Sequence, residues 1–269
     1  MNPSVLFVFI LSILLGVLRA ADLAFGTDAV TGLCVVGSVW WRYLALGIVV
    51  LAAVLVGRTQ PSRSEAVRSR RPLAGILAFV GAVCFLAAAG GQFVLGSAAE
   101  LSGSVRIILE CLCSAWLSTM GRCWLSPNEW KKPFGGLYLA VAGSLLFYWN
   151  VLLRFMENSS SWHRVEPTAM VWQMLAALVF LSAMVRALWL PETSNGCQLC
   201  EAGICTFLLC FCWELPRVLV LLFHGITAAD LPEVLFGFGM CCIGALGLFT
   251  VARVAGSDGR PAIPRHAVG

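Results

Sequence analysis

The stretch "LAGILAFVGAVCFLAAAGGQFVLG", residues 73–96, contains no Asp, Glu, Lys or Arg. About 20 apolar residues in an α-helix cross the ~30 Å hydrocarbon core of a bilayer. Backbone groups in that core must be hydrogen-bonded within the protein, which restricts membrane-spanning segments to helices or closed barrels. A barrel strand alternates apolar and polar residues over about ten positions. Apart from Gln92 this stretch is apolar, without such alternation, so we predict a transmembrane helix.

The same pattern recurs along the whole chain. Its 269 residues are 59% hydrophobic and 12% charged, against about 25% charged residues in soluble domains, and the mean hydropathy is +0.88. We therefore predict an all-α polytopic transmembrane bundle of about eight spans. It forms a single domain over residues 1–253, followed by a short flexible tail at 254–269. The predicted spans are residues 3–19, 40–57, 73–96, 104–121, 136–155, 168–189, 203–224 and 234–253.

Two alternatives concern the number of spans. The first segment resembles a signal peptide in its position, but "MNPSVLF" (1–7) lacks the basic start that such a peptide carries. A seven-span chain would place its two ends on opposite sides of the membrane and would weaken the charge pattern described next.

Lysine and arginine are unevenly distributed between the two sides of the predicted bundle. Cytoplasmic loops carry an excess of these residues. With both termini placed in the cytoplasm, most of the 18 basic residues fall on that side, which favours an even number of spans and a protein of the plasma membrane. These residues are Arg58, Arg63, Arg68, Arg70, Arg71, Arg122, Lys131, Lys132, Arg186, Arg253, Arg260 and Arg265.

The predicted cytoplasmic loop 58–71 holds five of these arginines. Such a loop orients the chain, and it is also a candidate site for a protein partner or anionic lipid. No basic face is interleaved with aromatic residues, so nucleic acid is not expected as a partner. No predicted loop is long enough for a soluble domain of about 50 residues or more. Any function must therefore lie in the bundle or at its rims.

Charged residues interrupt the seventh predicted span in "CFCWELPRVLV" (210–220). Ionisable groups at membrane depth are costly, roughly 2.5–3.5 kcal/mol each on insertion scales, and they are functional candidates. Glu214 and Arg217 are three residues apart and share a helix face. Pro216 removes the donor for the carbonyl group of Cys212, and we predict a hinge there.

The fourth predicted span carries a similar arrangement in "VRIILECLC" (105–113). Arg106 and Glu110 are four residues apart and match Glu214 and Arg217 in depth once the opposite helix directions are considered. We hypothesise that the fourth and seventh spans pack together and form one substrate or ion site from these four side chains. The alternative is that each pair only neutralises its own charges and fixes the helix register.

Four uncharged polar side chains within the spans are further candidates to line such a site. They are Gln92, Tyr148, Asn150 and Gln173.

Most of the twelve cysteines lie inside apolar segments, where cysteine behaves as a small hydrophobic residue. Cys197 and Cys200 form a C-x2-C pair on a predicted cytoplasmic loop. A structural zinc ion needs four ligands, so these two are only a partial match, and we predict no metal and no cofactor. No zinc-protease, nucleophile-elbow or P-loop motif is present, which argues against an enzyme.

The sequence leaves two functions open. The first is a small permease or channel-like protein in which Glu110 and Glu214 take up a cation, a proton or a solute amine. The second is a non-catalytic accessory or sensor-type subunit that acts through a partner at loop 58–71. A polar cavity that reaches the glutamates favours the first function, and a solid apolar core favours the second.

Overall fold

The computed structural model describes residues 2–28, 33–60, 65–69, 71–126, 133–156, 165–190, 196–224 and 227–256. Within these ranges the chain is almost entirely helical, and one isolated β-bridge joins Thr27 to Cys34. Eight helical segments are long and apolar enough to cross a membrane, which confirms the predicted all-α polytopic bundle.

Six of the eight spans are single helices, while the first is extended by a π-helical turn and the seventh is made of three segments. The elements are α1 (Pro3–Ala21), η1 (Asp22–Gly26), α2 (Val39–Arg58), η2 (Glu65–Arg68), α3 (Pro72–Val94), η3 (Ser97–Ala99), α4 (Leu101–Leu125), α5 (Gly136–Met156), α6 (Val165–Trp189), α7 (Gly196–Thr206), η4 (Phe207–Trp213), α8 (Glu214–His224) and α9 (Leu231–Gly256).

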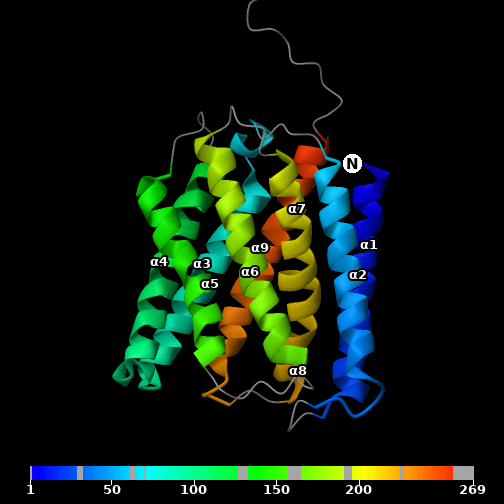
Figure 1. Cartoon of the computed structure of the whole chain (residues 1–269). Coiled ribbons are helices and arrows are strands. Elements are labelled where there is room, and N and C mark those ends of the chain that lie inside the picture. Colours follow the sequence, from blue (N-terminus) through cyan, green and yellow to red (C-terminus); the bar gives the residue numbers. More distant parts are fainter. Residues whose placement is uncertain are drawn as a thin grey trace, which may run out of the picture.

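The described ends of the chain lie at one end of the bundle, which we call the terminal end (Figure 1). Helix α9 runs through the middle and is the most deeply buried span. It packs against α3 on one side and against α7, η4 and α8 on the other. Helices α4 and α5 extend the bundle beyond α3, and α1 and α2 border the seventh span.

The seventh span begins earlier than the sequence predicted. Helix α7 starts at Gly196, so Cys197 and Cys200 lie in its first two turns and not in a loop. Leu199 and Cys200 are buried, whereas Glu201 turns outward and pairs with Arg58. The polar residues that suggested a loop are thus on the outward side of a helix.

The basic loop is partly folded onto the bundle at the terminal end. Arg68 donates hydrogen bonds to the carbonyl oxygen of Leu188, and the indole of Trp124 donates to the carbonyl of Val67. Arg71 is buried, and this burial, with Arg253 nearby, lowers its pKa to about 10. These arginines contribute to packing. Arg63 and Arg70 lie outside the described residues, so a partner at loop 58–71 stays a prediction.

The seventh span changes its helical geometry in the middle of the membrane-spanning region. Residues Phe207–Trp213 form a π-helix, which ends directly before Glu214. Pro216 has no N–H to donate to the carbonyl of Cys212, and its ring clashes with that carbonyl in an α-helix. Widening of the preceding turns relieves the clash. Sequence indicated a disturbance at Pro216 but not a π segment of this length.

Two glycines allow neighbouring helices to approach the π segment closely. A Cβ atom at Gly16 of α1 would lie 2.6 Å from the carbonyl oxygen of Cys212, and one at Gly244 of α9 would lie 2.7 Å from the amide nitrogen of Phe211. The π segment is therefore held between α1 and α9, and any larger residue at either glycine would push these helices apart.

Helix α2 offers a matched test of this close packing. A methyl group at Gly57 would collide with the backbone of Glu201 on α7, whereas one at Gly47 meets nothing. Gly57→Ala should lower the free energy of unfolding by about 1–3 kcal/mol. Gly47→Ala should be neutral or stabilising, because alanine favours helix. Thermal unfolding in detergent measures both, and equal midpoints for the two variants would contradict the packing.

Candidate functional site

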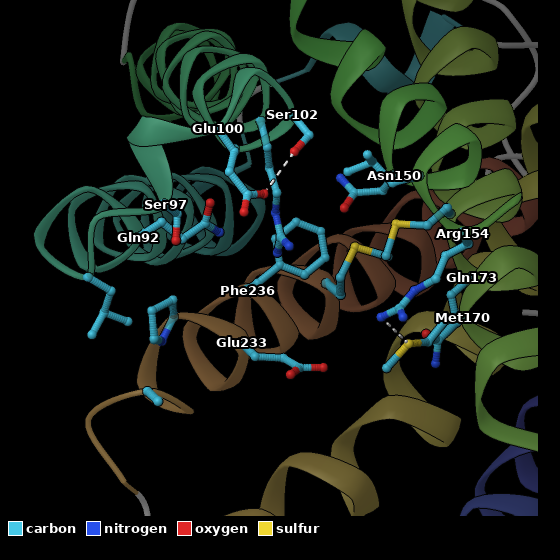
Figure 2. A pocket seen from close by; sticks show the side chains of 18 of the residues that line it. Gln92, Ser97, Glu100, Ser102, Asn150, Arg154, Met170, Gln173, Glu233 and Phe236 are labelled. Atoms are coloured by element: carbon cyan, nitrogen blue, oxygen red, sulfur yellow. Dashed lines mark hydrogen bonds between the residues drawn. The ribbon is translucent and has the colours of Figure 1, made fainter. Parts of the chain in front are cut away.

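A cavity of about 610 Å³, drawn from close by in Figure 2, opens at the end of the bundle opposite the terminal end, beside residues 95–100 between α3 and α4. Helices α3, α4, α5, α6, α8 and α9 contribute to its wall. Its polar and charged lining residues include Gln92, Ser97, Glu100, Ser102, Arg106, Asn150, Arg154, Gln173, Glu214, Arg217 and Glu233.

The first predicted pair lies behind the α4 side of this cavity. The Nε of Arg106 donates to Oε1 of Glu110 at 3.0 Å, and the amide of Gln92 donates to the same oxygen at 2.9 Å. Glu110 is fully buried, and its Oε2 has no hydrogen-bond partner among the described residues. The guanidinium of Arg106 lies 5.1 Å from the ring centre of Phe236 on α9. Arg106 therefore separates the buried carboxylate from the open cavity.

The second predicted pair lies on α8, directly after the π segment. Arg217 donates to Oε1 of Glu214 through Nη2 at 2.5 Å and Nε at 3.0 Å. Gln173 donates to the other oxygen, Oε2, at 3.0 Å and to the carbonyl of Leu209 at 3.1 Å. The Gln173 amide thus ties the Glu214 carboxylate to the backbone of the π segment.

Arg217 also reaches two further glutamates. Its Nη1 lies 3.0 Å from a carboxylate oxygen of Glu233 on α9 and 3.5 Å from one of Glu166 on α6. The side chains of Glu233 and Glu166 are 50% and 36% exposed, whereas that of Glu214 is buried. One guanidinium therefore connects three helices at the mouth of the cavity, and it compensates the buried charge of Glu214.

The fourth and seventh spans are not packed against each other as the sequence suggested. Helix α4 packs on α3 and α5, while α9 contacts both α3 and the seventh span and lies between the pairs. Helices α3 and α9 are apolar over their central turns, so sequence gave no sign that they would take this place. The two pairs meet instead across one cavity, which Arg106, Glu214 and Arg217 line directly.

Three of the four additional polar candidates lie at this cavity. Gln92, Asn150 and Gln173 line it, while Tyr148 is half-exposed elsewhere on α5. Sequence reasoning missed Glu233 and Glu166. Both stand in the first turn of a helix, where an acidic residue is also explained by the helix dipole.

Aromatic rings close the cavity toward the terminal end. The ring of Phe85 on α3 packs edge-on against Phe236, with centres 5.4 Å apart, and against Phe147 on α5 at 6.3 Å. Phe85 and Phe147 are fully buried. Along α3, Phe85 lies seven residues from Gln92, about 10 Å deeper in the bundle. The cavity is therefore open at one end and closed near the middle of the bundle.

Carboxylates outnumber guanidinium groups around the cavity. Three glutamates and three arginines line it, and two further glutamates, Glu110 and Glu166, pair with Arg106 and Arg217 from outside the lining. The glutamates are Glu100, Glu110, Glu166, Glu214 and Glu233, and the arginines are Arg106, Arg154 and Arg217. This excess, with three amide side chains as hydrogen-bonding groups, suits a small cation or an amine.

No group of three or more metal-ligating side chains occurs in the part of the chain that the structure describes. The thiol of Cys197 donates to the carbonyl oxygen of Gln60 at 2.8 Å, and Cys200 is buried in the bundle. These contacts give both cysteines a role in packing α7.

Comparison of this chain with protein families, with curated proteins and with solved structures finds no match.

The Glu214–Arg217 pair can be tested by a double-mutant cycle. Arg217→Gln should lower the free energy of unfolding by about 3–5 kcal/mol, because it leaves the buried Glu214 carboxylate without its cation. Adding Glu214→Gln should recover part of that loss. Thermal or denaturant unfolding in detergent is the measurement.

The exposed pair between Arg58 and Glu201 is the control for this cycle. Arg58→Gln should cost less than about 1 kcal/mol, since the Arg58 side chain is 67% exposed. Strictly additive effects of the two cavity substitutions would contradict the coupling that the contacts imply.

Proposed function

We propose that this integral membrane protein is a small permease whose cavity binds a small cation or an amine-bearing solute. The observation that supports the proposal most is the open cavity of about 610 Å³, lined by the Glu214–Arg217 pair and by Arg106. A solid apolar core, expected of an accessory subunit, is not what this end of the bundle contains. Orientation with both termini in the cytoplasm would make the cavity open outward.

The lining suggests a route into the site. Glu100, Glu233 and Glu166 lie at the mouth, where their charges attract a cation from solution. Deeper in, Glu214 shares its oxygens with Arg217 and Gln173, so a solute amine would replace one of these donors. The unpartnered Oε2 of Glu110 would offer a further acceptor if Arg106 moved aside.

A permease fits this geometry better than an open pore, since the Phe85, Phe147 and Phe236 rings close the path. Alternating access then requires a helix that can change shape. Glu214 and Arg217 follow the π segment directly, so a change of bend at this irregular turn would move both. The Pro216 region is thus the proposed hinge.

Uptake into proteoliposomes tests this proposal. Wild-type protein should accumulate methylammonium or guanidinium above the level of empty liposomes. Glu214→Gln should lower the initial rate at least tenfold, because it removes the charge that pairs with the solute. Asp230→Asn is the matched control, as Asp230 binds Thr227 in the α8–α9 connection and does not line the cavity. No wild-type uptake for either probe, or equal loss in both variants, would refute the proposal.

Water access to the cavity is tested separately by thiol labelling. Asn150→Cys should react with a membrane-impermeant thiol reagent from one side of the membrane only, because Asn150 lines the open cavity. Ser144→Cys lies six residues along α5 toward the closed end and should remain unlabelled. The native protein, with its own twelve cysteines, gives the background. Equal labelling of the two variants would mean that the cavity is not the path of access.

A further inference from the structure

A second hollow lies on the other face of α6, away from the cavity. It is a groove of about 870 Å³ between α2 and α6, and α7 forms its floor. Most of its lining is apolar and comes from Val50, Val54, Trp172, Leu175, Ala176, Leu178, Val179, Ala183, Ala202, Cys205 and Leu209.

The groove runs along the membrane-spanning part of the helices. Its lining extends along α6 from Trp172 to Arg186, which is about 21 Å at 1.5 Å per residue. This length exceeds half of the ~30 Å hydrocarbon core. Val179, in its centre, is 56% exposed. The groove therefore opens sideways, toward the position of lipid chains.

The charged side chains of the lining, Arg186 and Glu201, lie at one end of the groove, the terminal end of the bundle, and Ser182 lies one turn from Arg186. Arg186 is exposed there, three residues before α6 ends. Gln198 and Glu201 of α7 complete this end of the lining. Arg58, the last residue of α2, pairs with Glu201 and is 67% exposed. Two guanidinium groups thus stand where the apolar groove ends.

We propose that this groove binds one glycerophospholipid, with an acyl chain along α6 and the phosphate at Arg186 and Arg58. The apolar length matches a chain that begins at the membrane surface and passes toward the bilayer centre. Arg186 and Arg58 outnumber the one carboxylate at this end, Glu201, and so leave the net positive charge that a lipid phosphate requires. Guanidinium binds phosphate through paired hydrogen bonds. This site is separate from the cavity and does not depend on the permease proposal.

The bound lipid would touch a residue that also supports the cavity. Leu209 lines the groove, and its backbone carbonyl accepts a hydrogen bond from Gln173. Gln173 in turn binds Glu214. A lipid in the groove would therefore contact the π segment on the face opposite the cavity.

Native mass spectrometry of the detergent-purified full chain tests this proposal, with phosphatidylglycerol and diacylglycerol as probes. The wild-type protein should retain one phosphatidylglycerol and bind diacylglycerol at least tenfold more weakly. Val179→Trp should lower binding of both probes at least tenfold by filling the groove. Val83→Trp, at a similarly exposed position of α3 outside the groove, should bind as the wild type does.

The headgroup contact is tested by Arg186→Gln. This variant should bind phosphatidylglycerol about tenfold more weakly than the wild type and should bind diacylglycerol equally well. Arg122→Gln, also exposed at the terminal end but outside the groove, is its control. Arg186 is exposed, so this variant keeps the test valid if the tryptophan variant fails to fold. The proposal is overturned if the wild type retains no phospholipid, or if the control variants lose as much phospholipid binding as the groove variants. It is also overturned if the wild type is a dimer and Val179→Trp makes it a monomer, because the groove would then be a protein interface.

Discussion

The cavity end of the bundle depends on one ion pair, between the guanidinium group of Arg217 and the carboxylate of Glu214. A carboxylate buried among apolar helices is tolerable only with a cation beside it, and Arg217 provides that cation for Glu214. The same group reaches Glu233 and Glu166, so a single side chain sets the relative positions of α6, α8 and α9. The contacts that compensate the buried charge of Glu214 therefore also hold the wall of the cavity together. The amide of Gln173 adds a hydrogen bond to the second oxygen of Glu214.

The π segment follows from the same short stretch of sequence. Pro216 cannot continue a regular α-helix with its neighbours four residues earlier, and the wider turns displace the chain just before Glu214. Helix α6 stands beside this segment and separates two very different hollows. Gln173 faces the charged cavity, while Trp172, one residue earlier, faces the apolar groove. A helix with such a division carries both chemistries without a long loop or a separate domain.

Sequence predicted the fold well, because each span is a long apolar segment and the bilayer permits few alternatives. Charge at that depth also drew attention to Glu110 and Glu214, of which Glu214 lines the cavity, while their role in binding stays a prediction. Sequence did not predict that α3 and α9 would lie between the fourth and seventh spans. Apolar helices such as α3 and α9 differ little in composition, so nothing in the sequence states which neighbours they take. Close contacts at glycines contribute to that arrangement. The packing of Gly244 against Phe211 is one example, and the sequence does not indicate which segment such a glycine contacts.

The close approach of Gly16 to the carbonyl of Cys212 gives the first span a task beyond crossing the membrane. In an α-helix this carbonyl would accept from the N–H of residue 216, but proline has none. Helix α1 covers the carbonyl and shields it from hydrocarbon. Arg19 of the same helix lies over the ring of Trp213, 4.8 Å from its centre. Helix α1 thus braces the irregular turn that carries the charged site. A chain lacking this helix would keep every residue of the cavity wall, yet would leave the distorted turn without its external support.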